Sequence, residues 1–227
     1  MKILVVAAHP DDEVLGCGGT IARFAREGQH LINIAILGEG TTSRFTQRDQ
    51  ADAPLMKVLH TCSHEVGKML GARGVSLHGL PDNRFDALPL LEVVKIVERL
   101  IEIHAPNAVY THHASDLNVD HRITHQAVLT ATRPMRGQCV QEVYAFEIPS
   151  STEWAFQRGE SSFQPNVFVD IADTLSLKVQ AFCHYETEVR SFPHPRSPEA
   201  ITAIGQRWGS IVGCYAAEAF ELIRAIK

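Results

Sequence analysis

The chain has 227 residues, of which 45% are hydrophobic and 21% are charged, a composition typical of a globular protein with one sizeable core. Its 21 Lys and Arg residues are outnumbered by 26 Asp and Glu residues, and the formal net charge of -5 argues against a nucleic-acid partner. The apolar runs are far shorter than a membrane-spanning helix, so we expect no membrane insertion.

Short apolar runs alternate with stretches of helical periodicity along the chain. Two stretches predict helices: Glu13–Glu27, which Gly28 would terminate, and Leu90–Ile103. We expect strands at Ile3–Ala8, Leu31–Leu37, Val75–Leu77, Ala108–Thr111, Val140–Ile148 and Val167–Ile171. The alternation predicts an α/β fold with a mostly parallel sheet, whose ligand site should lie at the carboxyl ends of the strands.

The second half of the chain predicts loops and helices within the same domain. Ser150–Pro165 is polar with few periodic apolar positions, so we expect a long surface loop that flanks the site. From Asp173 onward the pattern predicts helices, interrupted by the three prolines of Ser191–Pro198. Because the sequence contains no repeat and no convincing linker, we predict a single domain over residues 1–227.

An imidazole and three carboxylates follow the first predicted strand, in the segment Ala8-His9-Pro10-Asp11-Asp12-Glu13. Adjacent carboxylates repel one another, and a bound divalent cation is the simplest account of such a cluster. Alternatively, Asp11 or Asp12 caps the helix that follows, a role that would not require His9. We favour the metal site over capping alone.

A second concentration of polar side chains follows the strand predicted at Ala108–Thr111: residues 111–125 contain four histidines and two aspartates. His121 and His125 are four residues apart, as in the zinc-binding H-E-x-x-H helix. Arg122 stands where that motif has its glutamate, so the general base would be missing. We therefore favour His9, Asp12 and His121 as the metal ligands, with His125 behind them or in the core.

Three segments together make the sequence similar to the PIG-L/LmbE-like deacetylase family over almost its whole length. They are Ala8–Glu13, the pair Asp120-His121 before a helix, and the closing Tyr215–Phe220. The resemblance implies a Rossmann-like, mostly parallel sheet flanked by helices, a zinc ion held by His9, Asp12 and His121, and a general base at Asp11. Family members deacetylate N-acetylglucosaminyl lipids, mycothiol and bacillithiol precursors, chitobiose and antibiotic sugars.

One departure from the family pattern affects the expected mechanism. Many members have a histidine three positions before the metal-binding histidine, whereas this chain has Asn118. Asparagine can donate a hydrogen bond to an oxyanion but cannot supply a proton. We assign the oxyanion to Asn118, include Asp120 among the catalytic candidates, and leave the acid open between protonated Asp11 and another histidine.

Loops after the second and third predicted strands, and one near the carboxyl terminus, supply candidate substrate-binding residues. Each of these loops could instead be a solvated or structural turn. The candidates are Arg44, Asp82, Arg84, His194 and Arg196.

The sequence thus predicts a hydrolase of linear amide C–N bonds that removes an N-acetyl group from an amino sugar, nucleotide sugar or glycosylated metabolite, with Zn²⁺ as cofactor. One alternative is a metal-dependent hydratase of a small dicarboxylate, which would need two or more cationic side chains near the metal. A sugar-binding protein without activity is the other. Five scattered cysteines without a C-x-x-C pair indicate a cytoplasmic protein, and a homo-oligomer is compatible with the sequence.

Overall fold

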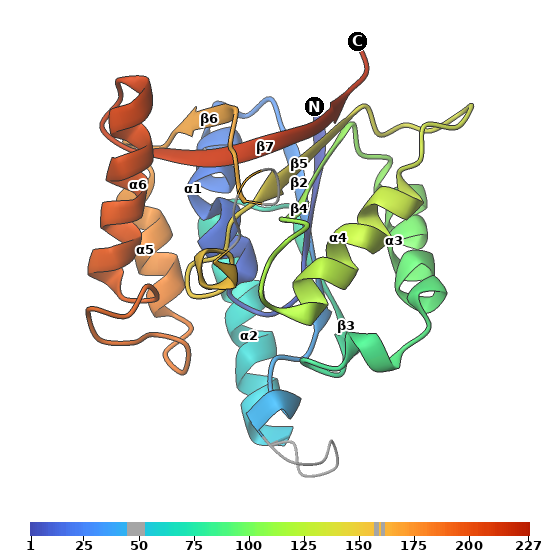
Figure 1. Ribbon diagram of the computed structural model, residues 1–227, viewed down its shortest axis with the longest axis horizontal. Coiled ribbons are helices and arrows are strands. Elements are labelled where there is room, and N and C mark those ends of the chain that lie inside the picture. The colour runs from blue at the N-terminus through green and yellow to red at the C-terminus, as the bar shows by residue number, and fades with distance from the viewer. Residues whose placement is uncertain (45–52, 157–158, 160–161) are drawn as a thin grey trace.

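In the computed structural model, which describes residues 1–44, 53–156, 159 and 162–227, seven strands form one sheet in the order β3-β2-β1-β4-β5-β7-β6 (Figure 1). Strands β1 to β5 run parallel to one another, and β7 is antiparallel to both β5 and β6. The strands are β1 (Lys2–Ala7), β2 (Leu31–Gly38), β3 (Gly74–Leu80), β4 (Ala108–His112), β5 (Glu142–Phe146), β6 (Val167–Asp170) and β7 (Ala217–Ala225).

Helices cover both faces of the sheet (Figure 1). One face packs against α1 (Asp12–Glu27), α2 (Ala53–Leu70), α5 (Leu175–Cys183) and α6 (Pro198–Val212), and the other against α3 (Leu90–His104) and α4 (Val119–Ala131). Short 3₁₀ turns are η1 (Thr42–Arg44), η3 (Phe85–Ala87) and η4 (Glu153–Ala155). No helix in these described ranges has the length and apolarity needed to cross a membrane.

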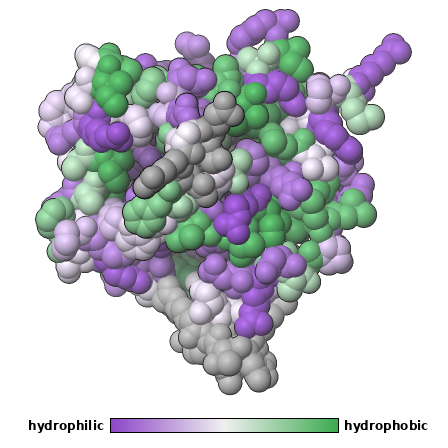
Figure 2. Space-filling view, viewed as in Figure 1, coloured by the Kyte–Doolittle hydropathy of each residue, from purple (hydrophilic) through white to green (hydrophobic). Residues whose placement is uncertain are grey.

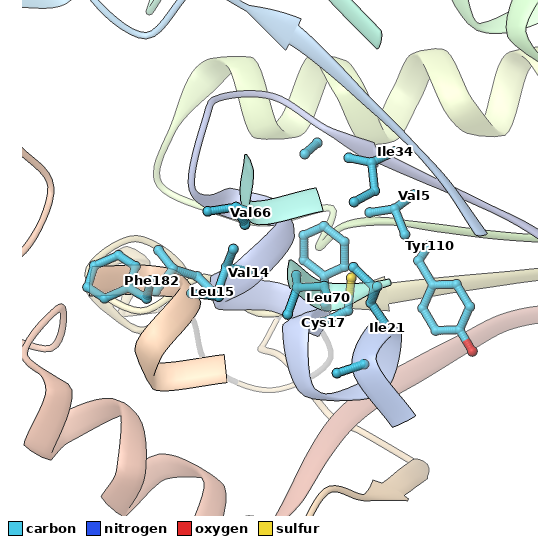
Figure 3. Packing of buried hydrophobic residues seen from close by; sticks show 14 of the residues in the cluster. Val5, Val14, Leu15, Cys17, Ile21, Ile34, Val66, Leu70, Tyr110 and Phe182 are labelled. Carbon is cyan, nitrogen blue, oxygen red and sulfur yellow. The ribbon is translucent and has the colours of Figure 1, made fainter. Parts of the chain in front are cut away.

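Strand β1 divides the hydrophobic core into two layers, because successive side chains of a strand point to opposite faces. Ile3, Val5 and Ala7 belong to the cluster on the α1 side, which Figure 3 shows from close by. The alternate side chains of β1, Leu4 and Val6 among them, pack on the α3–α4 side. Each fully buried aliphatic side chain contributes about 1.5–3 kcal/mol to stability. On the face shown in Figure 2, by contrast, hydrophobic and hydrophilic residues are interspersed.

Helix α1 is interrupted at Cys17 (φ −150°, ψ 22°), and a buried ion pair supports the interruption. Glu218 of β7 accepts hydrogen bonds from the backbone N–H groups of Gly19 (2.9 Å) and Thr20 (2.6 Å), which restart the helix. Lys178 of α5 donates to the same carboxylate at 2.6 Å and to Leu15 O at 2.8 Å. The carboxylate therefore ties α1, which carries Asp12, to the far end of the chain.

The predicted α/β architecture is confirmed, as is the end of α1 at Gly28, whose φ of 69° suits glycine. The prediction of helices from Asp173 to the end of the chain is wrong for the last part of that segment. Residues 217–225 form β7 instead, because this segment fills the gap between β5 and β6 and buries Phe220 completely. Ladder pairing on both edges overrides any local helical preference.

Candidate metal centre

The carboxyl ends of β1 and β4 bring together the three residues that the sequence predicts as metal ligands. β1 lies between β2 and β4, the point where the strand order reverses and where ligands bind in such sheets. His9 Nδ1, Asp12 Oδ2 and His121 Nε2 lie 3.3 Å from one another in each pairing. All three side chains are buried, with 9%, 0% and 1% exposure respectively.

The donor set of this cluster fits a divalent cation. Two histidine nitrogens face each other without room for a proton on both, and Asp12 Oδ1 is buried with no hydrogen-bond partner among the described residues. Burial opposes the ionised form of Asp12, yet the nearby His121 and His112 rings hold its pKa well below the ordinary value. Two imidazoles and a carboxylate are the ligands of catalytic zinc sites, which keep a further position open.

His9 is oriented by two carboxylates on the side away from the cluster. Its Nε2 lies 3.0 Å from Asp120 Oδ2 and 3.1 Å from Asp82 Oδ1, which places a proton on Nε2 and leaves Nδ1 for a metal. Asp120 is held in turn by the backbone N–H groups of Asn83 (2.6 Å) and Phe85 (2.9 Å). These contacts account for the carboxylates of Asp82 and Asp120, which together with the His9 ring form a second group that could hold a cation.

His121 is oriented in the same way by Asp116. The Asp116 carboxylate lies 3.1 Å from His121 Nδ1, so His121 Nε2 faces the cluster. The hydroxyls of Ser151 and Thr152 and the backbone N–H of Asn118 all donate to Asp116. The loop that follows β5 therefore supports His121, a predicted ligand on α4.

Asp11 occupies the N-cap position of α1, but its side chain does not cap the helix. Its φ of 104° lies in a region that favours glycine and costs about 1–3 kcal/mol for other residues. Asp11 Oδ2 instead accepts a hydrogen bond from Arg196 Nη1 at 3.0 Å. Burial raises the pKa of Asp11 well above its ordinary value, and the Arg196 guanidinium opposes that shift. Capping alone therefore does not explain this residue.

Asn118 is the N-cap of α4, and its Oδ1 accepts a hydrogen bond from the backbone N–H of Asp120 at 2.8 Å. The cap leaves the Nδ2 end of the half-buried side chain for another acceptor. His125 lies further along α4, and its ring donates through Nδ1 to His112 O at 2.8 Å. Neither of the two groups of described residues that could hold a metal ion includes His125.

The candidate substrate residues lie in different surroundings. Arg196 and His194 belong to one loop, in which His194 Nδ1 accepts from the Arg196 backbone N–H at 3.0 Å. Asp82, predicted as a substrate-binding residue, is instead buried against His9 and the N–H and hydroxyl of Ser43. Arg84 is half-buried before η3, and the side chain of Arg44 lies outside the described residues.

Sequence reasoning gave no role to several residues at this site. Asp116 lies in the histidine-rich stretch, two residues before Asn118, and this position could have indicated that it belongs to the site. The ring of Trp154 meets the His194 ring edge-on at 5.5 Å, although the two residues are far apart in sequence. Glu13 and Tyr185 form a buried hydrogen bond of 2.6 Å, and nothing local in the sequence indicates that pairing.

The chain is similar in sequence to known deacetylases. Residues 4–132 match the family model for PIG-L, GlcNAc-PI de-N-acetylase. The chain is 28% identical over 177 residues to the uncharacterized deacetylase YaiS of Escherichia coli, covering 75% of this chain and 82% of that one.

Two solved structures share the fold. The N,N'-diacetylchitobiose deacetylase of Pyrococcus horikoshii superposes with a TM-score of 0.78 at 18% identity, covering 98% of this chain and 84% of the other. A 4-carboxy-2-hydroxymuconate hydratase from Pseudomonas putida superposes with a TM-score of 0.76 at 20% identity, covering 100% and 97%. The architecture is therefore common to a deacetylase and a hydratase.

Proposed function

The chain belongs to the PIG-L family of GlcNAc-PI de-N-acetylases, and on this basis we propose that it is a zinc-dependent N-deacetylase of an N-acetylated amino sugar, nucleotide sugar or glycosylated metabolite. The observation that carries the proposal is the pairing of a His/Asp/His cluster with an adjacent acid, Asp11, that neither caps its helix nor belongs to the cluster.

His9 through Nδ1, His121 through Nε2 and Asp12 would hold the zinc ion. A zinc ion bound there would polarise the amide carbonyl and supply an activated water. The orphaned Asp12 Oδ1 and the two opposed imidazole nitrogens support this assignment. Asp82, Asp120 and Asp116 keep the two rings in the required orientation.

Asp11 acts as the general base in this proposal. Its carboxylate is buried beside the ligands and is held by Arg196, so it is positioned to take a proton from the attacking water. The amide nitrogen must leave as an amine and therefore needs a proton. A carboxyl group that has just accepted one is well placed to return it.

Asn118 donates to the oxyanion in this proposal, and its backbone geometry supports the role. The cap engages Oδ1, which leaves the N–H donors of the same amide at the start of α4, one helical turn or less from His121. Arg196 contacts Asp11, and His194 contacts the Arg196 backbone in the same loop; in this proposal the two side chains bind substrate hydroxyls.

A hydratase of a dicarboxylate is disfavoured by the charges at the site. Such a substrate needs two or more cationic side chains near the metal. Arg196 lies beside the acids of the site, and its ion pairs with Asp11 and Glu188 already neutralise it. A neutral N-acetyl group is the better match.

We also propose that residues 1–227 act as one domain in the cytoplasm, since the seven strands form one sheet and all five cysteines are free thiols.

A screen for released acetate tests the activity. Zinc-loaded protein is incubated with N-acetylglucosamine, N,N'-diacetylchitobiose and a nucleotide sugar that carries an N-acetyl group, and 4-carboxy-2-hydroxymuconate is assayed for hydration in parallel. The proposal expects acetate from at least one sugar and no hydration. Hydration without acetate release would reverse the assignment.

A further inference from the structure

A buried chain of hydrogen bonds reaches the backbone of Asp11, whereas Arg196 binds its carboxylate. Asp11 donates through its backbone N–H to Glu13 Oε2 at 3.1 Å. Glu13 Oε1 accepts the Tyr185 hydroxyl at 2.6 Å, and Tyr185 Oη also lies 3.2 Å from Ser63 Oγ of α2. All four residues are at most 2% exposed. The chain therefore runs through the protein interior from α2 and the end of α5 to the turn before α1.

Each carboxylate oxygen of Glu13 accepts one of these hydrogen bonds. Oε2 fixes the N–H of a residue whose backbone is in an unfavourable conformation, φ 104° and ψ −28°. Oε1 is fixed by the tyrosine hydroxyl. Without that hydroxyl, Oε1 would be a buried, unpaired acceptor, and the carboxylate would turn toward a new partner. The Asp11 N–H would then lose its acceptor, and the turn would relax.

We propose that Tyr185 is a positioning residue for catalysis, which acts through Glu13 to hold the backbone of Asp11 and so the direction of its carboxylate. The inference rests on the proposed role of Asp11 as general base. Arg196 holds the carboxylate of Asp11, and the Tyr185–Glu13 pair holds its backbone, so the side chain is fixed at both ends.

The chain also offers a matched control. Tyr144 donates to Glu142 at 2.8 Å, which is the same type of tyrosine–glutamate bond, on β5 near the strand end remote from the site. Tyr185→Phe and Tyr144→Phe each remove one hydroxyl and keep the ring. If only Tyr185→Phe lowers activity, the loss is due to where the Tyr185–Glu13 hydrogen bond lies and not to the removal of a tyrosine hydroxyl as such.

The first test needs no substrate. Hydrogen exchange of individual backbone amides is measured in the metal-free protein for wild type, Tyr185→Phe and Tyr144→Phe. We expect the Asp11 amide to exchange about tenfold faster or more in Tyr185→Phe alone, because a buried bond to a carboxylate is lost. An unchanged Asp11 amide would overturn the inference. So would an equal acceleration of the Leu4 and Val5 amides of β1, since that would report lower global stability.

The second test is kinetic. Tyr185→Phe is expected to lower kcat by about 10-fold or more at unchanged KM and zinc content, since misplacement of a catalytic group by about 1 Å suffices for such a loss. In the Asp11→Asn background the same substitution should cost less than about twofold, because residues that act through one another are not additive. Tyr144→Phe should leave kcat unchanged in both backgrounds.

The two failures are distinguishable. Normal turnover by Asp11→Asn contradicts the proposed function. Slow Asp11→Asn together with normal Tyr185→Phe contradicts the positioning role alone, as does an undiminished effect of Tyr185→Phe in the Asp11→Asn background.

Discussion

Arg196 Nη1 lies 3.0 Å from Asp11 Oδ2, although the two residues are 185 positions apart in the sequence. Arg196 also donates through Nε to Ser150 Oγ at 2.9 Å. One guanidinium thus connects the turn after β1, the loop after β5 and the segment before α6.

Arg196→Ala should therefore impair catalysis more than metal binding. The substitution leaves the Asp11 carboxylate buried without its cationic partner, and we expect kcat to fall by about 10²-fold, the effect of losing an orienting contact to a general base. Steady-state kinetics and elemental analysis measure the two properties. Arg190→Ala is the control, because the Arg190 guanidinium of the same segment donates to the backbone oxygens of Thr187 and Val189. Equal losses in both variants would remove Arg196 from the site.

Asp116→Asn should weaken metal binding, because Asp116 fixes the ring of His121. Loss of a carboxylate behind a metal-binding histidine typically costs 10- to 100-fold in affinity, and we expect about that loss of zinc affinity here. Competition with a chelator measures it. The pair His113–Glu221, at 3.0 Å, supplies the control, since Glu221→Gln alters the same type of contact away from the three ligands. Unaltered zinc affinity in Asp116→Asn would show that the His121 ring needs no support.

Two substitutions at Asn118 separate its capping role from its proposed oxyanion role. Asn118→Asp keeps an oxygen for the Asp120 N–H but removes the amide donor, whereas Asn118→Ala removes both. We expect kcat to fall by roughly 10- to 10³-fold in each, as for loss of one oxyanion donor, and Tm to fall only in Asn118→Ala. Full activity of Asn118→Asp would leave Asn118 with the cap alone.

The buried pair Lys178–Glu218 should matter for stability and not for zinc binding. Glu218→Ala leaves the Lys178 ammonium buried and two N–H groups of α1 unpaired. We expect the free energy of unfolding to fall by about 3–5 kcal/mol, the usual cost of breaking a buried pair. Urea denaturation measures it. A change of under about 1 kcal/mol, typical of an exposed pair, would contradict the role of this carboxylate as the support of α1.

The sequence predicts those parts of the site whose residues lie close together along the chain or at the ends of neighbouring parallel strands. His9, Asp11 and Asp12 lie within four consecutive positions, and a strand end followed by a helix explains their clustering. Their meeting with His121 follows from parallel pairing of β1 and β4, which the alternation of elements predicts.

The residues that sequence reasoning did not find act across long separations. Tyr185 and Glu13 are 172 positions apart, and the ring of Trp154 reaches His194 from another loop. No periodicity or spacing encodes such contacts. The strand β7 is not predicted from the sequence for a similar reason: its conformation depends on pairing with β5 and β6 on either side.

The central claim is most directly tested by titrating metal-depleted protein with zinc while acetate release from N-acetylated sugars is measured. The account predicts that acetate release rises with zinc and saturates at about one ion per chain, the stoichiometry of a mononuclear site. Asp11→Asn should bind the same amount of zinc and release acetate about 10²-fold more slowly. Acetate release that is undiminished without metal, or zinc-loaded protein that leaves every N-acetylated sugar intact, would contradict the account.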